Sequence, residues 1–220
     1  MKRRSLREET ADLFDQVDKW SSFILANLLW CILSIPLITL PAATAGIFAV
    51  MSLRVRGKQP ELFHEFFGAM RRLWLKATIV GLADLVIGGL VVFNAFIFPM
   101  MDMSNPIVFA SRSMTIFIAL ALLLTNLYVW SLMVLYEDMS VKQLAKTSIK
   151  LVFAYPFWSI GTLIVALVPV IISLVFPQIV FLIFTISCFV MIVNMGTWRV
   201  IRRHIPEEEL QHLEARHVVQ

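Results

Sequence analysis

Charged residues are scarce in this chain of 220 residues: Asp, Glu, Lys and Arg make up 15% of it, against 59% for hydrophobic residues. Ordinary globular domains are about 25% charged and about 45–50% apolar. The mean hydropathy of +0.81 therefore excludes a disordered chain, and it excludes a soluble basic nucleic-acid-binding protein although the net charge is +4. We expect a chain surrounded largely by lipid, with no nucleic acid among its partners.

Residues typical of covalent frameworks and catalytic motifs are also few. The two cysteines, Cys31 and Cys188, lie in long apolar runs, where a thiol behaves as a small hydrophobic group. The sequence contains no Gly-rich phosphate loop, no zinc-ligand spacing, no nucleophile elbow and no paired carboxylates within an apolar run. These absences predict a protein that is not an enzyme and that binds no metal or cofactor.

Long apolar runs are what the sequence does contain. Four of them, residues 75–98, 114–135, 157–176 and 179–198, have about the 20 residues needed to cross a bilayer. Backbone groups must be hydrogen-bonded internally in hydrocarbon, and the runs do not alternate polar with apolar residues, so each should be a helix.

The first apolar block, residues 21–53, is too long for one straight crossing and too short for two, and Pro36 and Pro41 interrupt it. Two interpretations are open. In the favoured one, residues 21–40 lead out and residues 43–55 return as a short limb, with the turn at Pro41 and the following alanine. In the other, the block is one kinked helix and the N-terminus lies outside.

Charge favours the hairpin. Lys and Arg gather in residues 54–76, in residues 137–150 and after residue 198, whereas residues 99–113 contain only Arg112. Basic connections stay on the cytoplasmic side. We therefore predict an all-α polytopic membrane protein with five main membrane helices, a short returning limb after the first, and both termini in the cytoplasm.

Amphipathic helices are expected at the cytoplasmic surface, over residues 61–74 and 140–151. A third, with Leu13, Val17 and Trp20 at helical spacing, would belong to an N-terminal segment of residues 1–20. The membrane domain would then span residues 21–200, and a polar tail residues 201–220. The candidate contacts of the first amphipathic helix are its aromatic and basic residues, Phe63, Phe66, Phe67, Arg71 and Arg72.

Asp84 is the only acidic or basic residue in the interior of a clear membrane run. It shares a helical face with Ala77, Gly81 and Gly88, and small residues let a neighbouring helix approach closely. At 1.5 Å per residue, Asp84 lies about 13 Å from the inner end of its helix, and Asn126 lies at about the same depth in the next. The two side chains are expected to meet, either as a functional polar site or as a structural hydrogen bond.

The opening of the first block has a distinctive pattern: Asn27-Leu28-Leu29-Trp30, Ser34-Ile35-Pro36-Leu37-Ile38-Thr39 and Pro41-Ala42-Ala43-Thr44-Ala45-Gly46, followed by Phe63-His64-Glu65-Phe66-Phe67. The pattern resembles the YesL-like family of bacterial membrane proteins, whose activity is not established. The resemblance implies a multi-pass protein of the bacterial inner membrane, associated with carbohydrate uptake, and brings no catalytic residue.

Two functions remain open. The first is a non-enzymatic accessory or interaction component, whose partners would be the lipid bilayer and a sugar-transport complex or another membrane protein. The second is a transporter or channel for a small solute or ion, using Asp84, Asn126 and a helix break at Pro36, Pro41 and Gly46.

Overall fold

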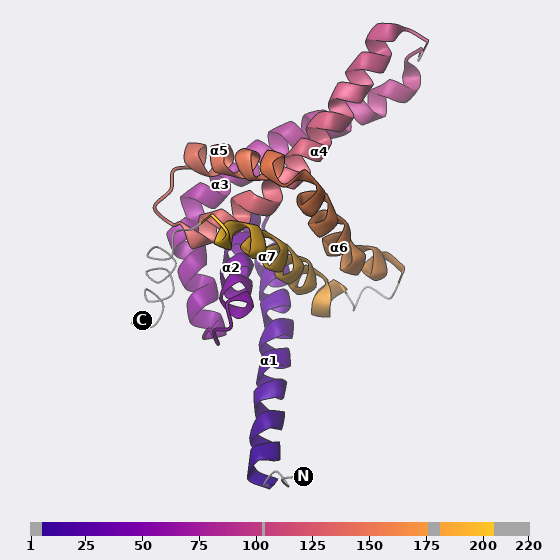
Figure 1. Cartoon of the computed structure of the whole chain (residues 1–220). Coiled ribbons are helices and arrows are strands. Elements are labelled where there is room, and N and C mark those ends of the chain that lie inside the picture. The colour runs from indigo at the N-terminus through magenta and orange to yellow at the C-terminus, as the bar shows by residue number, and fades with distance from the viewer. Residues whose placement is uncertain (1–5, 103, 176–180, 205–220) are drawn as a thin grey trace.

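The computed structural model describes residues 6–102, 104–175 and 181–204. Within these ranges the chain forms helices joined by short turns, and no strand is present (Figure 1). The elements are α1 (Leu6–Leu33), α2 (Leu40–Val55), α3 (Leu62–Ile97), η1 (Phe98–Met100), α4 (Pro106–Leu135), α5 (Val141–Ala154), α6 (Pro156–Val175), η2 (Phe181–Thr185) and α7 (Ile186–Arg202). The predicted fold class, a polytopic helical membrane protein, is confirmed.

Four helical stretches are long and apolar enough to span a membrane: α3 with 36 residues, α4 with 30, α6 with 20, and η2 with α7, together 22. They cover residues 75–97, 114–135, 157–175 and 181–198 of the four predicted runs, and residues 176, 179 and 180 lie outside the described residues. Helix α3 joins the predicted amphipathic helix of residues 61–74 to the following span without a break, because no proline lies between Pro60 and Pro99.

The first apolar block forms two helices, but the predicted position of the turn is wrong. Helix α1 ends at Leu33 and α2 begins at Leu40, so the turn precedes Pro41. Pro41 lies in the first turn of α2, where a missing N–H leaves no hydrogen bond unmade. The Trp30 indole N–H donates to Thr44 Oγ1 at 3.1 Å, which ties the end of α1 to the start of α2.

The two limbs of this hairpin are both short. Their apolar parts, Trp20–Leu33 and Leu40–Val55, are each between 10 and 17 residues long. A straight crossing of the bilayer needs about 20 residues. The first of the five predicted main helices is therefore shorter than expected. Helix α1 also runs without interruption across the boundary expected near residue 20.

Helix α2 lies at the centre of the molecule (Figure 1). It packs against α1, α3, α4 and α7, and every residue from Ala45 to Leu53 is buried. Small residues explain this position, since a Cβ at Gly46 would lie only 3.0 Å from the ring of Phe66 on α3. Close approach of this kind is how membrane helices pack without a hydrophobic driving force between them.

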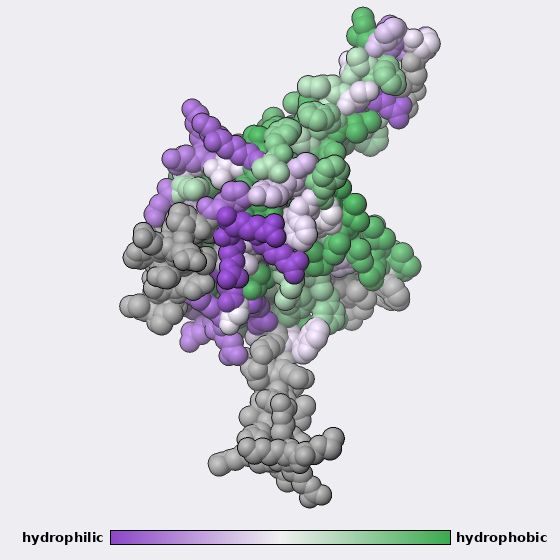
Figure 2. Space-filling model, in the orientation of Figure 1, coloured by the Kyte–Doolittle hydropathy of each residue, from purple (hydrophilic) through white to green (hydrophobic). Residues whose placement is uncertain are grey.

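Positive charge gathers at one end of the molecule, which we call the cationic end. It is formed by the end of α2, the first half of α3, α5 and the end of α7, and Figure 2 shows hydrophilic residues concentrated on one side and hydrophobic residues on the other. Ser140 and Gln143 form a capping box at the start of α5, the amphipathic helix that was predicted over residues 140–151. The cations of this end are Arg54, Arg56, Lys58, Arg71, Arg72, Lys76, Lys142, Lys146, Lys150, Arg199, Arg202 and Arg203.

Candidate functional site

Asp84 and Asn126 meet as their depths predict. The Asn126 amide Nδ2 donates to Asp84 Oδ1 at 2.8 Å, which joins α3 to α4. The Trp130 indole N–H donates to Asn126 Oδ1 at 3.1 Å. The carboxyl, the amide and the indole thus form a short hydrogen-bonded chain among apolar side chains, where an isolated polar group would be costly.

This chain of polar groups ends on the buried helix α2. The Trp130 ring stacks on Phe48 with the ring centres 6.0 Å apart. One turn before Asp84, a Cβ at Gly81 would lie 2.7 Å from Cγ of Pro41. The face of α3 that carries the small residues is therefore packed against α2 on the N-terminal side of Asp84. On the C-terminal side of Asp84, a Cβ at Gly88 would meet nothing within 4 Å.

The three residues of the predicted helix break do not lie together in one interruption. Pro36 is in the turn between α1 and α2, Pro41 is in the first turn of α2, and Gly46 lies inside α2 against Phe66. The side chain of Thr39 closes the turn, because its hydroxyl donates to the carbonyls of Leu33 and Pro36. Within the predicted break, irregular backbone is thus confined to the residues before α2.

The predicted interfacial residues differ in their surroundings. Phe63 is 56% exposed and Phe67 44% exposed, and Arg71 is also exposed. Phe66 is fully buried, so it is a core residue and not an exposed contact. Arg72 is engaged within the chain, because its guanidinium pairs with the Glu137 carboxylate at 3.1 Å.

A stripe runs along the first half of α3, which we call the aromatic stripe: it consists of the exposed side chains of Phe63, Phe67 and Trp74 and the half-buried side chain of Met70. Their spacing of three or four residues places them on one helical face. Phe67, Met70, Arg71 and Trp74 line an open groove of about 500 Å³. An apolar groove beside a cation is thus exposed at the cationic end.

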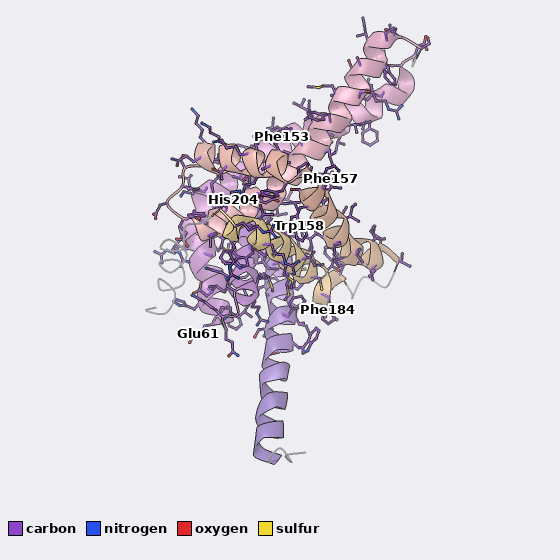
Figure 3. All side chains as sticks on the ribbon, in the orientation of Figure 1. Glu61, Phe153, Phe157, Trp158, Phe184 and His204 are labelled. Atoms are coloured by element: carbon purple, nitrogen blue, oxygen red, sulfur yellow. The ribbon has the colours of Figure 1, made fainter. Side chains whose placement is uncertain are left out.

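A second group of exposed aromatic residues was not predicted. Phe153 and Phe157 are strongly exposed at the corner between α5 and α6, and Trp158 follows them (Figure 3). Arg199 lies over the Trp158 ring, 5.7 Å from its centre. The run of aromatics around Pro156 was the signal in the sequence, since aromatic and basic residues together are typical of a membrane–water boundary.

The loop between α4 and α5 is held by α3. The Lys76 ammonium group donates to the carbonyls of Glu137 and Met139. Together with the Arg72–Glu137 pair, these bonds fix the loop against the first half of α3. Part of the positive charge predicted for surface contacts therefore stabilises the fold.

At the other end, Asp102 lies in the connection between α3 and α4. Its carboxylate accepts hydrogen bonds from the backbone N–H of Ser104 at 2.9 Å and from the Ser104 hydroxyl at 2.8 Å. These bonds lower the pKa of Asp102 below its ordinary value, because they favour the charged form. Asp102 thus caps the turn at the tip of this helix pair.

Comparison with known proteins finds a similarity to one family over part of the chain. Residues 23–95 match the model of a family described as a protein of unknown function, DUF624. No curated protein and no solved structure matches the chain.

The matched segment runs from the second half of α1 through α2 to the end of α3. It includes the residues that carry the resemblance noted in the sequence, the turn before α2 and Asp84. Asn126 and the α5–α6 corner lie outside it. Among the described residues, no group of three or more His, Cys, Asp or Glu side chains is arranged to hold a metal ion.

Proposed function

We propose that this protein is a non-enzymatic component of the bacterial inner membrane that binds another membrane protein at its cationic end. The observation that carries the proposal is the aromatic stripe of α3. Phe63 and Phe67 remain exposed on a helix whose opposite face, with Phe66, is packed in the core. Aromatic residues beside an arginine are the residues most enriched at protein interfaces.

The orientation of the protein is part of this proposal. Basic segments are retained in the cytoplasm, so the cationic end would face the cell interior together with both termini. Helix α3 would then present the aromatic stripe at the inner surface of the bilayer and cross the membrane with its second half. The family resemblance adds a sugar-transport complex as the expected partner.

Photo-cross-linking tests the proposal in intact cells. A photoreactive amino acid at position 67 should give a discrete adduct with a second protein, and the same amino acid at position 142, exposed on α5 at the same end, should not. Adducts with lipid alone at position 67, or identical adducts at both positions, would argue against a partner at the stripe.

A transporter or channel is the second candidate, favoured by the position of Asp84 within an otherwise apolar span. The hydrogen bonds among Asp84, Asn126 and Trp130 satisfy these groups without a solute. Proteoliposomes containing the parent protein or Asp84→Asn distinguish the two functions. Proton or solute flux that depends on Asp84 would support transport, and absence of flux from both would remove it.

A further inference from the structure

A separate cavity of about 650 Å³ opens between α1, the end of α2 with the loop that follows it, and α7. Volumes of this size are typical of sites for small ligands. The cavity shares none of its lining with the aromatic stripe or with the Asp84–Asn126 pair. It therefore requires an explanation of its own.

One side of the cavity is apolar and aromatic. Trp20 and Phe23 of α1 and Met191 of α7 line it. The Trp20 ring is 62% exposed and lies 6.4 Å, centre to centre, from the rings of both Phe23 and Phe184 (Figure 3 shows Phe184). An exposed tryptophan on an apolar cluster is typical of the level of lipid headgroups.

The other side of the cavity is cationic. Arg54 and Lys58 line it, together with the amide of Gln59. The loop turns at Gly57, whose φ of 78° suits glycine. The backbone N–H groups of Gly57 and Lys58 donate to the carbonyls of Arg54 and Leu53, so the end of α2 is satisfied by its own main chain. This loop and the end of α2 therefore place two cations at one side of the cavity.

We propose that this cavity binds one anionic phospholipid, with its phosphate at Arg54 and Lys58 and its first acyl carbons against Trp20, Phe23 and Met191. The argument is charge complementarity combined with polarity: cations occupy one side and hydrocarbon the other, as in a phospholipid. Guanidinium and ammonium groups bind phosphate oxygens through charge-assisted hydrogen bonds. Clusters of basic residues at the membrane surface attract anionic lipids. The proposal does not depend on a protein partner at the aromatic stripe.

Quenching of Trp20 fluorescence by brominated lipids tests the site. The purified protein is placed in phosphatidylcholine bilayers that contain an equal small fraction of brominated phosphatidylglycerol or brominated phosphatidylcholine, and subtraction of the Trp20→Phe variant isolates the Trp20 signal. Brominated phosphatidylglycerol should quench Trp20 at lower mole fractions. Lys58→Gln should reduce this preference about fivefold, as expected for one basic residue at a membrane surface, and Lys58→Arg should retain it.

Lys142→Gln, on exposed α5, removes the same charge from another part of the cationic end and should leave the preference unchanged. Equal quenching by the two lipids would overturn the proposal. So would an equal loss in Lys142→Gln, since that result would indicate general surface attraction. Glycerol phosphate that abolishes the preference at millimolar concentration would identify a soluble phosphate compound as the ligand and would also overturn it.

Discussion

The two pairs of long helices are held together in different ways. In the pair α6–α7, the Trp158 indole donates to the carbonyl of Gly196 at 2.9 Å, and Thr162 packs directly on that glycine. In the pair α3–α4, a cavity of about 420 Å³ lies between the outer halves, lined partly by Ala95 and Ala119. In Figure 1 this second pair projects away from the rest of the molecule. Helices α6 and α7 are therefore in close contact at a small residue, Gly196. Helices α3 and α4 are linked at the inner end of the pair by the hydrogen bond between Asp84 and Asn126.

Burial agrees with this difference. In the most apolar stretch of each helix, 6% of the residues are buried in α3 and 11% in α4, against 28% in α6 and 33% in η2 with α7. Leu85, Phe93 and Phe96 of α3 are among the exposed residues. Lipid is a good solvent for such side chains, so the outer part of α3–α4 does not need protein neighbours to remain in a bilayer.

A glycine substitution in each helix pair should give the largest difference in the free energy of unfolding. Gly196→Val should lower the free energy of unfolding by about 3 kcal/mol, because a Cβ there would lie 2.3 Å from Thr162 Cγ2. Gly89→Val should change it by less than about 0.5 kcal/mol, because nothing lies within 4 Å of that position.

Denaturation of the purified protein in sodium dodecyl sulfate, followed by circular dichroism, measures both changes. Thr162→Ala added to Gly196→Val should restore part of the loss by removing the clashing atoms. Equal effects of the two valines would mean that the pairs do not differ in packing.

Substitution of Asn27 should have the next largest effect on stability, since its side chain links α1 to η2 and the start of α7 by hydrogen bonds. Its amide donates to the carbonyls of Phe181 and Leu182, and its Oδ1 accepts from the Ser187 N–H. Asn27→Ala should cost about 2 kcal/mol, because it leaves buried backbone groups unsatisfied. Asn94→Ala, on the outer part of α3, is the control and should stay within about 0.5 kcal/mol.

The polar link at the base of α3–α4 should contribute less. Asp84→Ala and Asn126→Ala, measured singly and together, should give a coupling energy of about 1 kcal/mol, typical of hydrogen bonds between membrane helices. The same unfolding assay applies. Additive effects would show that the hydrogen bond does not stabilise the pair.

The smallest effect on stability is expected at the connection between α3 and α4, where Asp102 lies. The Asp102 pKa is lowered in the folded protein, so the contribution of its bonds to Ser104 is present above the ordinary pKa of about 3.9 and disappears as the pH falls through the lower, folded value. Ser104→Ala should raise the Asp102 pKa toward its ordinary value. Titration of the Asp102 carboxyl by nuclear magnetic resonance measures the shift, and an unchanged pKa would contradict the assigned bonds.

The lengths of the apolar runs predicted the four spans, and depth predicted the contact between Asp84 and Asn126, because a helix rises by a fixed amount per residue. The turn before α2 was misplaced for a physical reason. Proline breaks a helix in its interior but is favoured in its first turn, and the sequence does not show which of Pro36 and Pro41 is in which position.

Other features depend on contacts between distant parts of the chain. Phe63, Phe66 and Phe67 have the same chemistry, and only the packing of α2 on α3 determines that Phe66 is the buried one. Asn27 finds its partners in η2 and α7, more than 150 residues later. Helical spacing within one segment contains no information on such partners.

Cysteine accessibility in intact cells tests most directly whether α3 and α4 cross the bilayer as a pair. In a background with Cys31→Ala and Cys188→Ala, Ser104→Cys marks the tip between the helices and Lys142→Cys marks the cationic end; both positions are exposed. A membrane-impermeant maleimide should label position 104 in intact spheroplasts and position 142 only after the membrane is opened. Labelling of both positions from the same side would contradict the account.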